Sequence, residues 1–262
     1  MTGNEGVWLY AITSESLDGV SLSGVLGVAG EAVRVVHSTD LAAVVGSVDL
    51  DEFGEVPLRR HLEDLDWLAA TARAHERVVS AVLRCGPTIP LRLATLYLDD
   101  DRIRSLLEVG REKFCAALRS VAGRSEWGVK GYGDARALAQ TSPEKQAEPS
   151  PSGKGTAYLL RRRAELTAQQ NVQRRAAAEA DGLHAALLQR AVDGLRRPVT
   201  DPVLSGKRAW MIFNGTYLVD DDRVDDFTTF VATLDAEREG ITVELTGPWP
   251  PYSFSGIDMV TR

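Results

Sequence analysis

A polar stretch in the middle of the chain, residues 140–155, sets the strongest limit on its fold. Its sequence, QTSPEKQAEPSPSGKG, contains no apolar side chain larger than alanine or proline. Such a segment cannot bury enough apolar surface to offset the entropy that it would lose on ordering. We therefore predict a flexible linker over residues 139–155, which separates an N-terminal domain, residues 1–138, from a C-terminal domain, residues 156–262.

The N-terminal domain mixes short β-type runs with helical patterns. Val7–Ile12 is an unbroken apolar run, and the turn sequence STD between two further β-branched runs predicts a hairpin. After Pro57, apolar residues at three- and four-residue spacings predict one long helix to about Leu83. The other predicted elements are hairpin strands at Val33–His37 and Leu41–Val48, a strand at Ile89–Leu98, a helix at Asp99–Val121 and a strand at Glu126–Tyr132.

The C-terminal domain opens with a helical pattern over residues 156–197 that contains no proline. The first two thirds of this pattern are mostly polar, whereas leucines 183, 187, 188 and 195 give the last third an apolar stripe. A mostly polar helix either spans solvent between domains or coils loosely against another helix. Because only its last third is apolar, we predict a helical arm that is anchored at its C-terminal end. The predicted elements that follow are a strand at Arg208–Val219, a helix at Asp220–Glu239 and a strand at Ile241–Thr246.

Two segments of the chain echo each other without gaps. TLYLDDDRI, Thr95–Ile103, and TYLVDDDRV, Thr216–Val224, share a threonine, three apolar residues, three aspartates, an arginine and a β-branched residue. Helix capping accounts for the aspartates, because carboxylates accept bonds from the free N–H groups of a first turn. The whole match predicts that both domains use one strand–helix–strand module, as in ferredoxin-like α+β folds.

Charge is distributed unevenly over a chain whose formal net charge is −7. The only basic region is residues 153–197, with nine basic and four acidic side chains, whereas the segments before and after it are acidic. This pattern argues against nucleic-acid binding, for which a basic domain is expected. No uncharged stretch approaches the roughly 18 apolar residues of a membrane helix, and Cys85 and Cys115 lack metal-type partners. We expect a cytoplasmic protein that binds neither nucleic acid nor membrane.

The sequence offers no assembled site for catalysis, for a cofactor or for a metal. His61 and His75 lie 14 residues apart on one predicted helix, with no HExxH pattern or cysteine nearby. The glycine-rich stretch GVSLSGVLGVAG, residues 19–30, has neither the Rossmann nor the P-loop order. We therefore predict a protein that is not an enzyme and that holds no cofactor.

The candidate functional residues are Arg92, on the predicted strand Ile89–Leu98, and a block of prolines and aromatics, GPWPPYSF, near the end of the sequence. Three prolines favour polyproline geometry, which would place Trp249 and Tyr252 on one ridge. One interpretation is a lid that seals the core of the second domain, and another is a docking site for a partner. A third is a PxxP ligand for an SH3-like module. The candidates are Arg92, Pro248, Trp249, Pro250, Pro251, Tyr252 and Phe254.

This block also carries a family resemblance. LTGPWPPYSF, Leu245–Phe254, closely resembles the C-terminal signature of the gas vesicle protein F/L family. Weaker matches to the family occur earlier in the chain, in the same order as in the family. They are VWLYAI, IPLRLATLY, EWGVK, GTAYLLRRR and NGTYLV. Two departures are Leu93 and Ala94, which stand where the family usually has phenylalanine and glycine.

The resemblance implies two modified ferredoxin-like α+β domains, the second with a long coiled-coil-type helical segment. It also implies a non-enzymatic structural or assembly protein, associated with gas vesicles, that binds the small hydrophobic major shell protein and other accessory vesicle proteins. The alternative function is an adaptor that docks regulatory partners through the polyproline-aromatic block or the basic helix. The sequence leaves open which surface would bind the shell protein.

Overall fold

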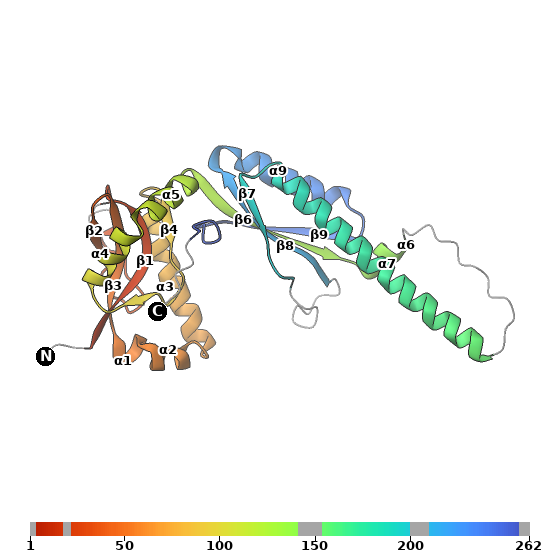
Figure 1. Ribbon diagram of the computed structural model, residues 1–262, viewed down its shortest axis with the longest axis horizontal. Coiled ribbons are helices and arrows are strands. Elements are labelled where there is room, and N and C mark those ends of the chain that lie inside the picture. The colour runs from red at the N-terminus through yellow and green to blue at the C-terminus, as the bar shows by residue number, and fades with distance from the viewer. Residues whose placement is uncertain (1–3, 18–21, 141–153, 200–209, 257–262) are drawn as a thin grey trace. The chain divides into compact units, whose positions relative to one another are not determined.

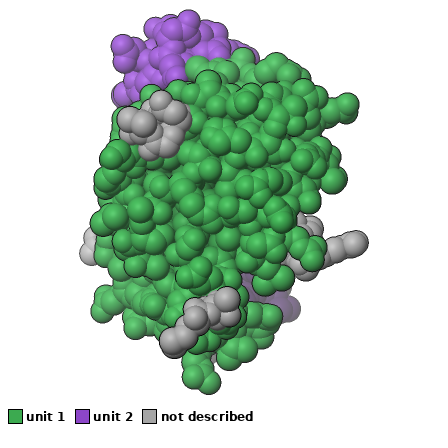
Figure 2. Space-filling model, turned by 90° about the vertical axis from the view of Figure 1, so that its left-hand side faces the viewer, with its two compact units in different colours: residues 1–126, 248–262 green, residues 127–247 purple. Residues whose placement is uncertain are grey.

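The computed structural model describes residues 4–17, 22–140, 154–199 and 210–256 (Figure 1). The chain divides into two compact units, coloured separately in Figure 2. Unit 1 comprises residues 1–126 and 248–262, and unit 2 comprises residues 127–247. These limits differ from the predicted boundaries at residues 138 and 156, because unit 2 begins earlier and the last residues return to unit 1. Residues 141–153 of the predicted linker lie outside the described residues.

Unit 1 is built on a sheet of antiparallel strands. These are β1 (Glu5–Ser14), β2 (Arg34–Ser38), β3 (Leu41–Asp49), β4 (Thr88–Pro90) and β5 (Leu96–Tyr97). Their order is β2-β3-β1-β4, and β5 also pairs with β1. The predicted hairpin is confirmed, since β2 and β3 pair up to Ser38 and Leu41, and Thr39 takes a φ of 56° in the tight turn between them.

The central strand β1 is buried on both faces, which explains its unbroken apolar run. Alternate residues point to opposite faces of a strand. Val7 and Leu9 accordingly join a core with the helices α4 (Asp100–Val109) and α5 (Arg111–Val121). Trp8 and Tyr10 join a second core with α3 (Leu65–Leu83). A register shift between Leu9 and Ala11 then moves the alternation by one residue, as a bulge does.

Both long helices predicted for this unit are interrupted. The first is divided into α2 (Glu55–His61) and α3, following the short α1 (Leu50–Phe53), because the Asp64 side chain caps α3 by accepting bonds from two backbone N–H groups. The second is divided at Gly110 into α4 and α5. Spacing alone missed both breaks, since the apolar pattern continues across them.

Unit 2 is built on a sheet of four strands ordered β7-β8-β6-β9. They are β6 (Arg124–Gly133), β7 (Asp193–Arg196), β8 (Trp210–Asp220) and β9 (Ile241–Trp249), of which β7 and β8 pair antiparallel. The helical elements are α6 (Ala135–Gln140), α7 (Lys154–Leu188), the 3-10 turn η2 (Asp221–Arg223) and α9 (Val224–Glu237).

The predicted helical arm is α7, although it is shorter than expected. The helix ends at Leu188, and residues 193–196 of the predicted arm form strand β7 instead. Its anchoring at the C-terminal end is confirmed, because Ala180, Leu183 and Leu187 pack in the core of unit 2. Residues 158–170, in contrast, are all exposed. Among the described residues, no helix is long and apolar enough to cross a membrane.

The two echoing segments form similar elements with different caps. Thr95–Ile103 contains β5 and the start of α4, and Thr216–Val224 contains the end of β8, η2 and the start of α9. The Asp99 side chain accepts a bond of 2.8 Å from the N–H of Arg102, whereas Asp220 makes no such capping bond. The predicted order of strand and helix is confirmed in both places, but the aspartates of the second segment have another environment.

Candidate protein-binding site

The proline-aromatic block begins on a strand and ends in a tight turn. Strand β9 runs on to Trp249, three residues beyond its predicted end, and Pro248 is tolerated there because β9 lies at the edge of its sheet. The chain then turns, with Tyr252 N–H donating to the Pro250 carbonyl at 2.7 Å and Phe254 N–H to the Pro251 carbonyl at 3.3 Å. The predicted polyproline ridge through Trp249 and Tyr252 was therefore wrong.

The turn is fixed to unit 1 by two carboxyl groups. Glu126, which is 6% exposed, accepts bonds from the backbone N–H of Ser253 at 2.8 Å and from its hydroxyl at 2.6 Å. The Tyr252 hydroxyl donates to Glu76 on α3 at 3.2 Å. Burial, with the nearby Glu76 carboxyl group, raises the pKa of the Tyr252 hydroxyl, so the phenol keeps its proton. The expectation that this block seals the second domain was wrong, because residues 248–262 belong to unit 1.

The side chains of the block divide into buried and exposed groups. Pro250 and Pro251 are buried, and Tyr252 and Phe254 are half-buried. Trp249 is 50% exposed, although tryptophan is usually well covered. The block thus combines a buried attachment to unit 1 with one large aromatic side chain that remains available to solvent.

Arg92 does not lie on a strand, as the sequence predicted. The predicted strand is broken into β4 and β5, and Arg92 is exposed on the loop between them. The Thr95 hydroxyl donates to the Arg92 carbonyl at 2.7 Å, and Ala94 adopts a φ of 66°, so the loop makes a sharp turn. Arg92 and the block both belong to unit 1.

His75 is a structural residue of the core. It is 3% exposed, and its Nδ1 accepts a bond of 3.0 Å from the Trp8 indole. Its Nε2 lies 2.9 Å from the Leu91 carbonyl and must therefore carry the proton. Burial lowers the pKa of His75 to about 4, so the ring is neutral near pH 7. The described residues contain no group of three or more metal-type side chains.

A groove along α3 lies beside the attachment point of the block, and sequence analysis did not find it. Its walls are α3 and the segment Gly24–Leu26, and it encloses about 650 Å³. Glu76, which binds Tyr252, lines it together with Arg73, Arg77 and Arg84. The spacing of these arginines, which places them on one face of the helix, was the sequence pattern that could have predicted the groove.

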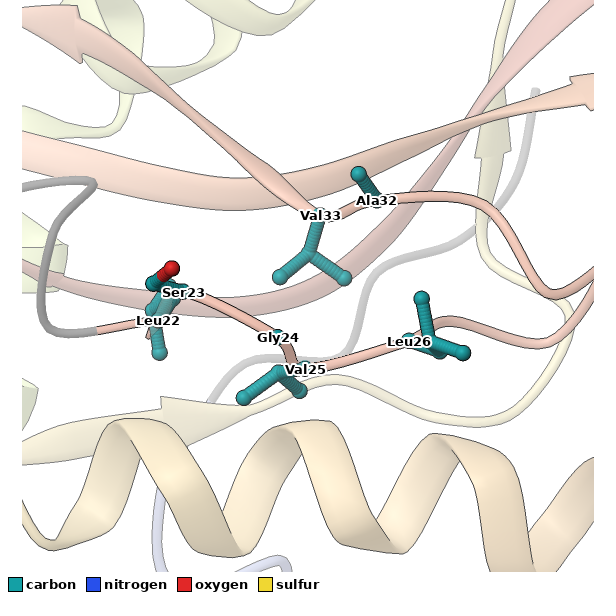
Figure 3. Close-up of a pocket in the computed structure, with 7 residues that line it drawn as sticks. All are labelled: Leu22, Ser23, Gly24, Val25, Leu26, Ala32 and Val33. Carbon is teal, nitrogen blue, oxygen red and sulfur yellow. The ribbon is translucent and has the colours of Figure 1, made fainter.

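A smaller pocket of about 380 Å³ shares the segment Gly24–Leu26 with the groove. Figure 3 shows its lining on two neighbouring stretches, Leu22–Leu26 and Ala32–Val33, which run above a helix. The two stretches are joined by an isolated bridge between Leu26 and Ala32. This pocket is mainly apolar, so groove and pocket together offer cations along α3 and aliphatic side chains opposite them.

These features define a protein of mixed helices and antiparallel sheets, whose unit 1 presents a fixed aromatic turn and a charged groove. The family of the gas vesicle synthesis protein GvpL/GvpF matches residues 6–256, and the chain belongs to that family. The resemblance carried by LTGPWPPYSF is thereby confirmed.

Individual relatives agree with this assignment. Gas vesicle protein L of Streptomyces sp. (strain CB03234) is 42% identical over 250 residues, which cover 95% of this chain and 92% of that protein. Gas vesicle protein F of the same strain is 27% identical over 88% of this chain and 91% of its own length. The crystal structure of GvpF from Anabaena sp. PCC7120 has a TM-score of 0.70 at 17% identity, covers 97% of each chain and shows the shared fold.

Proposed function

We propose that this chain is a non-enzymatic structural and assembly protein of gas vesicle formation that binds the small hydrophobic shell protein. Family membership implies the role in gas vesicle assembly. The observation that carries the finer proposal is Trp249, half-exposed beside a turn that the buried Glu126 fixes to unit 1. An aromatic side chain on a fixed backbone loses little entropy on binding an apolar partner.

The proposal includes the finer description of the fold and the location of the protein. Each unit would be a modified ferredoxin-like domain, which the echo of Thr95–Ile103 and Thr216–Val224 supports. The exposed part of α7 would act as a coiled-coil-type segment. The protein would work in the cytoplasm in association with gas vesicles, together with the shell protein and other accessory vesicle proteins.

Co-purification tests the central part of this proposal. The full chain, tagged and expressed with the shell protein under vesicle-forming conditions, should retain the shell protein through washing. The same tag on an unrelated protein of similar acidity serves as the control. If the full chain recovers no more shell protein than this control does, the proposal is wrong.

The second candidate function is an adaptor for regulatory partners, and the basic helix favours it. Arg161, Arg162 and Arg163 lie on the exposed part of α7, where only Arg162 has an acidic partner, Glu165 at 3.4 Å, among the described residues. Such a run is suited to an acidic protein surface. Deletion of the shell-protein genes separates the two candidates, because an adaptor would keep its partners in the deleted strain whereas an assembly protein would lose its main one.

A further inference from the structure

The groove along α3 carries an excess of positive charge. Arg73, Arg77 and Arg84 are all exposed, and none forms an ion pair or side-chain hydrogen bond within the described part of the chain. Glu76 is the one acidic residue among the described lining residues, and it accepts the Tyr252 hydroxyl. The groove therefore presents three cations against one carboxyl group.

The opposite wall of the groove supplies apolar surface. Leu26 is 52% exposed and Val25 is half-buried, and both follow Gly24, which has a φ of 80°. A ligand that fits this wall and the arginines carries several negative charges beside an apolar side chain, as a protein segment with carboxylates does. This requirement excludes a simple anion, which would leave the aliphatic wall uncovered.

Unit 2 of the same chain carries a surface with this complementary chemistry. Asp221, Asp222, Asp225 and Asp226 are exposed at the start of η2 and α9, and the described residues offer no ion pair to any of these carboxylates. Val224, half-buried, lies among them. Arg223 offsets one of the four charges. We call these five acidic and apolar residues, 221, 222 and 224–226, the acidic patch.

Both surfaces concentrate their charges on a short stretch of chain. Arg73 and Arg77 stand four residues apart on α3, one helical turn or about 6 Å along its axis. In the acidic patch, Asp221 and Asp225 are four residues apart, and so are Asp222 and Asp226. Asp221 and Asp222 belong to the 3-10 turn η2, and Asp225 and Asp226 belong to the first turn of α9. Four carboxylates therefore lie on one short stretch of chain, which allows several charge-assisted bonds to guanidinium groups at once.

We propose that the α3 groove of one molecule binds the acidic patch of a second copy. The groove is on unit 1 and the patch is on unit 2, so the contact joins unlike surfaces. Contacts of this kind form rings when they close and open chains when they do not. The proposal goes beyond the proposed function, because it concerns self-association and requires no shell protein.

Sedimentation velocity over a concentration series, at low and at high salt, tests this proposal on the full chain. Wild type should associate in a concentration-dependent way, and raising the salt should weaken association at least tenfold, because screening reduces attraction between exposed charges. The double variants Arg73→Glu/Arg77→Glu and Asp222→Arg/Asp226→Arg should each weaken it at least tenfold. The control Arg161→Glu/Arg163→Glu changes charge equally on α7 and should leave it within about twofold.

Mixing the variants gives the decisive result. The groove variant keeps its acidic patch and the patch variant keeps its groove, so an equimolar mixture should associate more strongly than either variant does alone. Either variant is informative if the other fails to fold, which circular dichroism checks. Wild type that is monomeric at every concentration, or charge reversals that act no more strongly than the α7 control, would overturn the proposal.

Discussion

Ala94 occupies a backbone conformation that ordinarily belongs to glycine. Its φ of 66° lies in the left-handed region, where a Cβ atom crowds the following carbonyl oxygen. The family that the chain resembles usually has glycine at this position. The Thr95 hydroxyl closes this turn by donating to the Arg92 carbonyl just before β5 begins. The chain therefore holds a strained residue in the loop that carries Arg92.

The variant Ala94→Gly should be more stable than wild type by about 0.5 to 1 kcal/mol. Glycine removes a left-handed penalty of about 1–2 kcal/mol, and its greater freedom in the unfolded chain cancels part of this gain. Urea unfolding measures the difference. The matched control is Ala72→Gly, at an exposed position inside α3, which should lose about 0.5–1 kcal/mol. If both variants lose stability, the loop is not strained.

Two glycines, Gly27 and Gly46, make room for the side chain of Glu31. A Cβ atom on Gly46 would lie 1.9 Å from the Glu31 carboxyl oxygen, and one on Gly27 would lie 1.8 Å from it. That carboxyl group accepts the Tyr10 hydroxyl at 2.5 Å. Gly27, in the glycine-rich stretch, and Gly46, on β3, thus leave room for the hydrogen bond between the buried strand β1 and the loop that carries Glu31.

At the scale of elements, His75 ties α3 to β1 and to the loop after β4. Its ring bridges the Trp8 indole and the Leu91 carbonyl, which lie on opposite sides of it in the sequence. Trp8 in turn packs edge-on against Phe53 of α1. Because both ring nitrogens are occupied, protonation of His75 would break its bond with Trp8.

We predict that stability falls as pH is lowered from about 6.5 to 4. The pKa of His75 is about 4 in the folded protein, against an ordinary value of 6.5, because burial disfavours the charged ring. Over this window the unfolded chain binds a proton that the folded chain does not, so acid favours unfolding. The loss is on the order of 3 kcal/mol. Urea unfolding at several pH values measures it in wild type and in His75→Gln, whose dependence should be flatter. Equal pH dependence in both proteins would contradict the assignment.

Sequence patterns predicted elements better than the interruptions between them. The hairpin of β2 and β3 follows from the turn sequence STD between two β-branched runs, and the anchored end of α7 follows from its leucine spacing; both are local properties. The break before α3 depends on the Asp64 cap, and the break between β4 and β5 depends on the turn at Ala94. Both breaks stand within patterns that continue across them, so periodicity could not locate them.

At the scale of the whole molecule, one unit combines two segments that are far apart in the sequence. Residues 248–262 belong with residues 1–126, and Ser253 binds Glu126. No local sequence pattern predicts the bond between Ser253 and Glu126, which are 127 residues apart, so the block was expected to belong to the second domain. The groove was missed for the same reason, since one wall comes from α3 and the other from the segment near Leu26. The signature itself needed no structure, because LTGPWPPYSF is specific enough to predict the family.

The most direct test of the account is shell-protein binding by the variant Trp249→Ala, measured together with its melting temperature. Trp249 is half-exposed, and under the proposed function it contacts the shell protein, so binding should fall about tenfold or more, as at an aromatic hot spot. The melting temperature should stay within about 2 °C of wild type, since surface substitutions have small effects on stability. Tyr158→Ala, at an exposed aromatic residue of α7, should change neither property. Unchanged shell binding by Trp249→Ala, or a loss of binding that only follows a loss of folded protein, would contradict the account.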